Sequence, residues 1–210
     1  MSNIRELIYS SDVIFWDFDG VIKKSNGVKN DAFLNLFDGI KKEEKEFILN
    51  HHISNQGLSR YKKIPYYMEY LNINTKQRNI QFYLRKFSDL VFDAVVNSEW
   101  VEGVLEILSG FEQSILVTAT PQDEIEKIIE KLEIGKFFKK IYGSPDTKIQ
   151  SVENFIKLRD INLNNCLLIG DSKSDLKCAN HFNMNFLFLK NENNKHLILD
   201  EDIPKIKNFL

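Results

Sequence analysis

The sequence has few of the residues that cross-link or interrupt a chain. Its 210 residues include 2 cysteines, 4 prolines and 9 glycines. Two cysteines cannot supply the disulfide network of a small secreted domain, so we expect Cys166 and Cys178 to be reduced thiols in the core. With 43% hydrophobic residues and so little proline and glycine, the composition excludes a disordered chain and predicts a packed globular protein.

The chain also lacks a strong excess of either charge. It has 28 lysines and arginines against 30 aspartates and glutamates, for a formal net charge of -2. No overall field would gather nucleic acid or an acidic membrane, and residues 1–12 contain no long apolar block. We therefore expect a cytoplasmic protein, monomer or homodimer, that binds neither nucleic acid nor membrane.

Short apolar runs are present instead of long ones. They lie at residues 13–16, 115–117, 166–169 and 186–189. Continuous rather than alternating apolarity is typical of strands that are buried on both faces of a parallel sheet. Helical patterns lie between and after these runs, at 101–108, 121–132, 147–158 and 172–181. The alternation of strand and helix predicts an α/β fold with a parallel sheet.

The stretch from about residue 30 to 97 contains no strand-like run. Its patterns predict helices at 31–37, 41–49, 59–71 and 75–96, the last with amphipathic spacing. We therefore expect an all-helical cap, residues 23–97, inserted into an α/β core formed by residues 1–22 and 98–210.

Polar residues follow the apolar runs, at the edge where parallel sheets bind ligands. In chain order they are Asp17, Asp19 and Gly20, then Thr118 and Ala119, then Asp171 and Asp175. A predicted helix that starts near Lys148 adds a cation to this set. Each alone would also fit a turn or a helix cap. The whole set, repeated in this order, favours a site for a divalent cation and a phosphoryl group.

Physical chemistry suggests a role for each residue. Asp17, which ends a strand, is the candidate nucleophile, and Asp19, two residues on, lies on the same side and is the candidate general acid and base. Gly20 permits a sharp turn close to the substrate. Mg²⁺ prefers oxygen ligands, which Asp17 and Asp171 would supply.

The remaining members of the set would bind the phosphoryl group or the metal. The Thr118 hydroxyl, the Ala119 amide and the Lys148 ammonium are candidate ligands for phosphoryl oxygens. Asp175 would either hold a water on the metal or orient Lys148.

These residues lie in segments that resemble a known family. "DFDGV" (17–21), "LVTATP" (116–121), Lys148 and "LLIGDSKSD" (167–175) are similar to the four motifs of the haloacid dehalogenase superfamily. The helical insertion resembles the cap of the subfamily that contains phosphoglycolate phosphatases and β-phosphoglucomutases. This resemblance implies a Rossmann-like core, Asp17 as nucleophile, Asp19 as acid and base, and Mg²⁺ bound by the Asp17 carboxylate, the Asp19 carbonyl and Asp171.

The resemblance leaves several activities open. Dehalogenases of the superfamily need neither a metal nor the second aspartate, so Asp19 and "GDSKSD" favour phosphate chemistry. "KKS" (23–25) departs from the acidic "DS" of many members. We expect a Mg²⁺-dependent phosphatase that acts on a small-molecule phosphate ester, such as a sugar phosphate or a phosphoglycolate-like compound. A phosphomutase and a non-catalytic binding protein are the alternatives.

Substrate specificity is expected to come from the cap. In "HHISNQGLSRYKK" (51–63), Gly57 would turn a loop towards the core and Arg60 would contact the substrate, although a solvated helix face is the alternative for Arg60. His51 and His52 are predicted to be helix-end residues, and residues 190–196 a polar surface loop.

Overall fold

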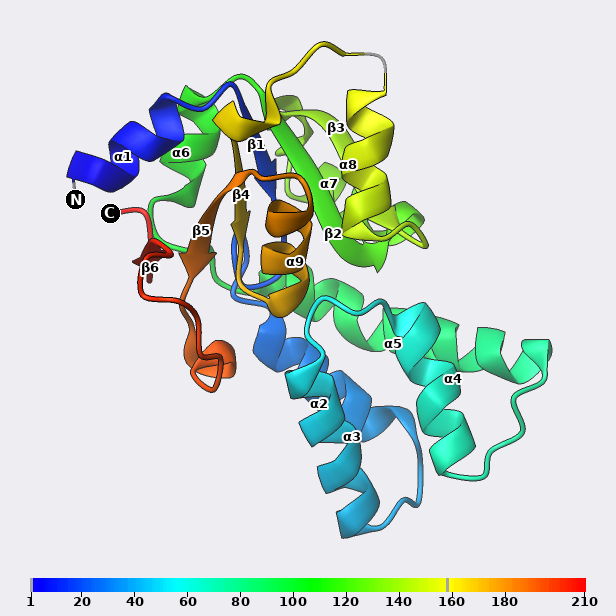
Figure 1. The fold of residues 1–210 in the computed structure, drawn as a ribbon. Coiled ribbons are helices and arrows are strands. Elements are labelled where there is room, and N and C mark those ends of the chain that lie inside the picture. The colour runs from blue at the N-terminus through cyan, green and yellow to red at the C-terminus, as the bar shows by residue number, and fades with distance from the viewer. Residues whose placement is uncertain (1, 158) are drawn as a thin grey trace.

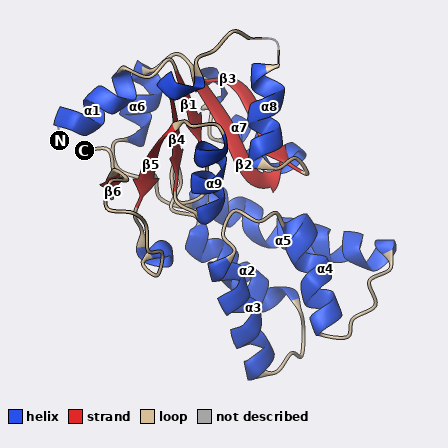
Figure 2. Cartoon of the chain, in the orientation of Figure 1, coloured by secondary structure: helices blue, strands red, loops and turns tan. Residues whose placement is uncertain are grey.

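The computed structural model describes residues 2–157 and 159–210, and its core is a six-stranded parallel sheet (Figures 1 and 2). The strand order is β3-β2-β1-β4-β5-β6, which places β1 inside the sheet. The strands are β1 (Val13–Trp16), β2 (Ser114–Pro121), β3 (Phe138–Ser144), β4 (Cys166–Gly170), β5 (Asn185–Leu189) and β6 (Lys205–Ile206). All four predicted strands are present, and the α/β fold with a parallel sheet is confirmed.

Alternate strand residues supply two hydrophobic cores, one on each face of the sheet. Ile14 and Trp16 pack with α1 (Ser2–Tyr9), α6 (Val104–Gly110) and α7 (Gln122–Lys131). Val13 and Phe15 pack on the other face with α8 (Lys148–Ile156) and α9 (Lys173–His181). Burial on both faces explains why the strands read as continuous apolar runs.

The cap consists of four helices between β1 and α6. They are α2 (Asn26–Leu36), α3 (Lys42–Ser54), α4 (Arg60–Tyr70) and α5 (Gln77–Asn97), and they project from the carboxyl end of the sheet (Figure 1). Phe33, Met68 and Phe87 belong to the same hydrophobic cluster as Trp16. Cap and core therefore share one continuous hydrophobic interior. The exact division at residues 23 and 97 stays a prediction.

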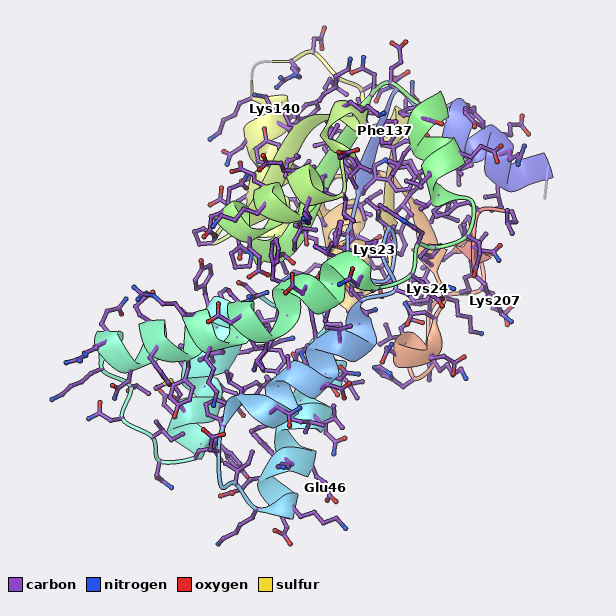
Figure 3. The ribbon with its side chains drawn as sticks, turned by 180° about the vertical axis from the view of Figure 1, so that it is seen from behind. Lys23, Lys24, Glu46, Phe137, Lys140 and Lys207 are labelled. Carbon is purple, nitrogen blue, oxygen red and sulfur yellow. The ribbon has the colours of Figure 1, made fainter. Side chains whose placement is uncertain are left out.

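The two linkers between core and cap are joined to each other. Lys23 pairs with Trp100 in an antiparallel bridge, and its buried ammonium donates to the Val96 carbonyl at 3.0 Å. Lys24 forms ion pairs with Glu99 at 3.3 Å and Glu102 at 2.6 Å. Figure 3 shows both lysines beside the end of α5. The unusual "KKS" segment thus has a structural role at the junction.

Three elements were not predicted: α1, β3 and β6. Strand β3 lies at the edge of the sheet, and its Lys139 and Lys140 are exposed, so it lacks a continuous apolar run. Three short 3₁₀ helices complete the fold: η1 (Gly135–Phe137), η2 (Leu163–Asn165) and η3 (Glu192–Asn194). Cys166 and Cys178 are free and buried, as expected. Among the described residues, no helix is both long and apolar enough for a membrane span.

Candidate active site

Asp17 is held rigidly where β1 ends. Its backbone amide donates to the Ile169 carbonyl of β4 at 3.0 Å, and its Oδ1 accepts from the Phe18 amide at 2.8 Å. Its Oδ2 lies 2.9 Å from Nζ of Lys148, the first residue of α8. A buried carboxylate at the carboxyl end of an interior strand is thus aimed and paired before any ligand binds.

Asp175 holds Lys148 in place. The two side chains form a buried ion pair, and the other carboxylate oxygen of Asp175 accepts from the amide of Ser172 at 3.1 Å and from its hydroxyl at 2.5 Å. Burial alone would disfavour the ammonium, but the carboxylates of Asp17 and Asp175 raise the pKa of Lys148 above its ordinary value. Of the two predicted roles of Asp175, the contacts match the orientation of Lys148; metal binding by Asp175 stays a prediction.

Three carboxylates form a tight acidic cluster. Asp17, Asp171 and Asp175 each place an oxygen within 4.8 Å of the others, and all three are buried. Burial, together with the charges of Asp175 and Asp19, raises the pKa of Asp17 to about 7 despite Lys148. Burial and the charge of Asp17 also raise the pKa of Asp171 well above its ordinary value. An all-oxygen donor set with this excess of negative charge fits a hard divalent cation.

Asparagine side chains from two distant segments position Asp171. Asn26 of α2 and Asn191 donate to its Oδ2 at 2.7 and 2.8 Å, and Asn194 donates to its carbonyl at 2.9 Å. Because Asn194 is buried, the interpretation of residues 190–196 as a surface loop was incomplete. Gly20 packs against Asp171: its φ is +80°, and a Cβ there would lie 2.1 Å from Asp171 Oδ2. A side chain at this position would strain the backbone and displace the Asp171 carboxylate.

Asp19 is surrounded by donors that the sequence did not identify as site residues. Its carboxylate accepts from Ser25 at 2.6 Å and from Thr120 at 3.2 Å, and it pairs with Lys29 of α2. Burial would raise the pKa of Asp19, but the Lys29 charge and these hydrogen bonds lower it overall. Lys29 follows Ser25 by about one helical turn, so the two side chains lie on the same face of the helix. This spacing was the one sequence feature that could have indicated that both contact Asp19.

Thr118 and Ala119 lie beside Lys148, as the motif order predicted. The Thr118 hydroxyl is buried and accepts from the Thr120 amide at 3.2 Å. Both residues line an open groove of about 740 Å³ that also includes Lys148. Ala119 additionally lines a smaller cavity of about 60 Å³, together with Asp17, Asp19 and Asp171. The groove and the inner cavity therefore meet at the predicted phosphoryl-binding segment.

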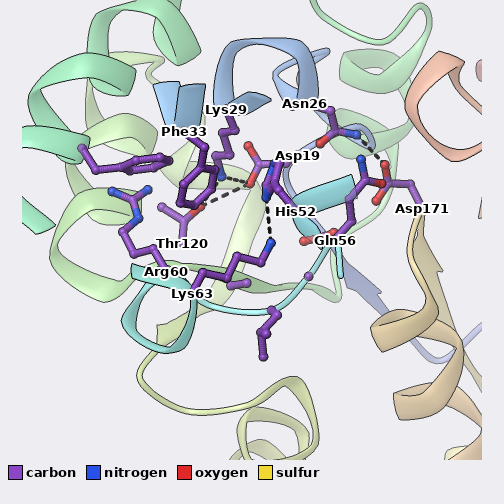
Figure 4. A pocket seen from close by; sticks show the side chains of 15 residues that line it. Asp19, Asn26, Lys29, Phe33, His52, Gln56, Arg60, Lys63, Thr120 and Asp171 are labelled. Carbon is purple, nitrogen blue, oxygen red and sulfur yellow. Dashed lines mark hydrogen bonds and ion pairs between the residues drawn. The ribbon is translucent and has the colours of Figure 1, made fainter. Parts of the chain in front are cut away.

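The cap forms the opposite wall of the inner cavity. Phe33, His52, Gln56 and Lys63 face the core residues across it (Figure 4). Gly57, with a φ of +82°, brings the loop after α3 against α9, where an added Cβ would lie 2.0 Å from Ser174 Oγ. The expected turn of this loop towards the core is confirmed, and residues of cap and core together line the inner cavity.

Arg60 lines the inner cavity, but its charge is already paired. Its guanidinium binds Glu124 of α7 through two hydrogen bonds of 2.6 and 2.7 Å, donates to Ser88 at 3.0 Å, and lies 4.4 Å from the centre of the Phe87 ring. The pair joins the cap to the core and is buried at both ends. Substrate contact by Arg60 stays a prediction.

The site is thus a buried carboxylate cluster at the carboxyl ends of parallel strands, under a helical cap. Residues 13–189 match the family model of the haloacid dehalogenase-like hydrolases, so the chain belongs to this family and the predicted resemblance is confirmed. A search among curated proteins finds no significant match.

Solved structures show the same fold. CbbY from Rhodobacter sphaeroides, in complex with xylulose-(1,5)-bisphosphate, is 12% identical with a TM-score of 0.72, and 94% of each chain is covered. A predicted phosphoglycolate phosphatase from Haemophilus somnus is 15% identical with a TM-score of 0.62, and 86% of each chain is covered. At these identities the likeness establishes the fold alone.

Proposed function

We propose that the protein is a Mg²⁺-dependent phosphatase that hydrolyses a small-molecule phosphate ester through an aspartyl-phosphate. The observation that carries this proposal is the arrangement of Asp17. Its carboxylate is buried at a strand end, belongs to an all-oxygen acidic cluster, and lies 2.9 Å from the ammonium of Lys148. Family membership supports the same reaction class.

The reaction proceeds in two displacements at phosphorus. In the first, a carboxylate oxygen of Asp17 forms the bond to phosphorus while the bond to the ester oxygen breaks, and Asp19 protonates that oxygen. In the second, Asp19 removes a proton from water, which attacks phosphorus and releases Asp17 and inorganic phosphate. Lys148 and the Ala119 amide bind the phosphoryl oxygens and balance their charge.

Asp17, the backbone carbonyl of Asp19 and Asp171 would hold the Mg²⁺. When bound, the ion offsets the repulsion between the anionic nucleophile and the anionic phosphate. Asn26 and Asn191 restrict Asp171 to one orientation, and Gly20 leaves the space that its carboxylate needs.

Lys29 has a role in the second displacement. Its ammonium pairs with Asp19 and lowers the pKa of that carboxylate. An ionised Asp19 is the form required to accept a proton from water. Lys29 therefore favours the function of Asp19 as a base. In the first step Asp19 must carry a proton, and there the charge of Lys29 opposes protonation.

A phosphate-release screen over metabolite phosphates, with and without Mg²⁺, tests the proposal. We expect Mg²⁺-dependent release that Asp17→Asn abolishes, whereas Asp31→Asn, an exposed aspartate of α2, retains full activity. Release that persists in Asp17→Asn would reject the aspartyl-phosphate mechanism.

The same screen distinguishes a phosphatase from a phosphomutase. The mutase is retained as the alternative because a predicted β-phosphoglucomutase from Thermotoga maritima has a similar structure, with 17% identity and a TM-score of 0.64. A phosphatase accumulates free phosphate in step with loss of the ester. Conversion of a sugar phosphate to an isomer without accumulation of phosphate would establish the mutase instead.

A further inference from the structure

We propose that the substrate carries a second anionic group on its leaving group, and that Lys63 of the cap binds it. This inference rests on the proposed function and adds the chemical class of the substrate: a phosphate ester that also bears a carboxylate or a second phosphate. Lys63 is thereby assigned as a specificity-determining residue.

Lys63 is a buried cation without an acidic partner. It extends from α4 into the inner cavity, its side chain is almost fully enclosed, and its ammonium is bonded to His52 Nδ1 at 2.8 Å (Figure 4). Among residues 2–157 and 159–210, no carboxylate lies within ion-pairing distance of it. The other two cap cations of this cavity are paired, Lys29 with Asp19 and Arg60 with Glu124. One positive charge in the cavity is therefore available to a ligand.

His52 fixes the direction of this ammonium. Burial and the neighbouring charge of Lys63 hold the pKa of His52 well below its ordinary value, so the ring is neutral and its Nδ1 accepts from Lys63. Phe33 packs against both, with its centre 4.5 Å from the centre of the imidazole ring and 5.7 Å from Lys63 Nζ. A neutral partner orients the ammonium without neutralising it, as a residue that binds an anion requires.

Gln56 adds an unused polar group to the same wall. Both its amide nitrogen and its amide oxygen are shielded from solvent, and neither has a hydrogen-bond partner in the described part of the chain. Buried polar atoms are normally bonded, so their lack of a partner indicates a place for a polar ligand. Gln56 and Lys63 line the same cavity as Asp17 and Asp19, so the leaving group of an ester attacked by Asp17 would lie within their reach.

Without a ligand, the buried charge of Lys63 carries an uncompensated desolvation penalty. Burial and the nearby Lys29 lower the pKa of Lys63 to about 7. An anion bound at the ammonium would offset this desolvation.

The test compares three esters in the presence of Mg²⁺. Phenyl phosphate has a neutral leaving group, 2-phosphoglycolate carries a carboxylate, and glucose 1,6-bisphosphate carries a second phosphate. We expect the wild-type protein to favour one of the two anionic esters in kcat/KM by roughly 10- to 100-fold, the range for one charged hydrogen bond. Which ester is favoured distinguishes the carboxylate from the second phosphate.

Lys63→Met should remove this preference, and a circular-dichroism spectrum that matches the wild type would report that the variant folds. Lys63→Arg should retain part of the preference, and Lys45→Met, which removes an exposed lysine of α3, should retain all of it. A wild-type protein without the preference, or an equal loss for all three esters in Lys63→Met, would overturn the proposal.

A binding measurement keeps this proposal separate from the proposed function. Calorimetric titration of Asp17→Asn protein with the two anionic esters should show binding that Lys63→Met weakens by roughly 10- to 100-fold, while orthophosphate binding is unaffected. Lys63-dependent binding without turnover in the wild type would reject the phosphatase and retain the site. Binding that does not depend on Lys63, or no binding of either ester, would reject the site.

Discussion

Replacing Glu124 with glutamine should destabilise the protein by about 3–5 kcal/mol, because the variant leaves the Arg60 guanidinium buried without its counter-ion. The two side chains are joined by hydrogen bonds of 2.6 and 2.7 Å, and their exposed fractions are only 5% and 4%. Both charges are buried where α4 of the cap meets α7 of the core. Glutamine has nearly the same volume as glutamate, so the loss reports the charge rather than a cavity.

The pair itself contributes less than this single substitution suggests. Desolvation of both charges offsets most of their attraction, so Arg60→Met combined with Glu124→Leu should cost much less than the sum of the two single changes. Urea unfolding followed by circular dichroism, with a double-mutant cycle, measures the coupling. Glu130→Gln, an exposed position of the same helix, is the matched control and should change stability by less than about 0.5 kcal/mol.

Two results would refute this reasoning. A loss below about 1 kcal/mol in Glu124→Gln would mean that water reaches the guanidinium, and strictly additive single effects would mean that the charges do not interact. The same proteins test the predicted substrate contact of Arg60: an unchanged KM for the true substrate in Arg60→Met would reject it.

Three further predictions concern the site. Asp19→Ala should retain the fold and reduce kcat by roughly 10²- to 10⁴-fold, as measured by phosphate release, and an unaltered kcat would reject its role as acid and base. Gly20→Ala should reduce Mg²⁺ affinity measured by calorimetry, since its Cβ would lie 2.1 Å from Asp171 Oδ2, and normal affinity would contradict the packing. Folding lowers the pKa of Lys63 from 10.5 to about 7. Between pH 7 and pH 10.5 Lys63 is therefore protonated in the unfolded chain and mostly neutral in the folded protein. Raising the pH from 7 to 10 should therefore stabilise the wild type relative to Lys63→Met, by at most about 1.4 kcal/mol per pH unit in urea titrations; a constant difference would contradict the burial of its charge.

Local patterns in the sequence predict the fold and the chemical centre. Strands buried on both faces must be apolar throughout, so Val13–Trp16 and Cys166–Gly170 are recognisable from their letters alone. The residues that follow them are brought together by the parallel sheet, because the carboxyl ends of its strands share one edge. Asp17 and Asp171 could therefore be placed at one site from these strands, whereas Lys148, which follows the unpredicted strand β3, was added from its place in the order of the motifs.

The residues that contact the site carboxylates from outside follow from no local sequence pattern. Asn191 and Asn194 reach Asp171 across the sheet edge, and Lys29 reaches Asp19 from the cap, because of how the elements pack. A polar residue such as asparagine occurs both in surface loops and in buried hydrogen-bond networks. The sequence does not distinguish these two environments, whereas the burial of the side chain in the structure does.

The pairing of the two cap cations could not be predicted from the sequence. Arg60 and Lys63 lie three residues apart on α4, both basic and both at the cavity. The sequence by itself determined that a cation-bearing helix follows the turn at Gly57, whereas the tertiary structure decided which cation is free. Helix α7 supplies Glu124 to Arg60, and no carboxylate of the described residues reaches Lys63. That difference arises from the packing of distant helices, which short-range sequence patterns do not encode.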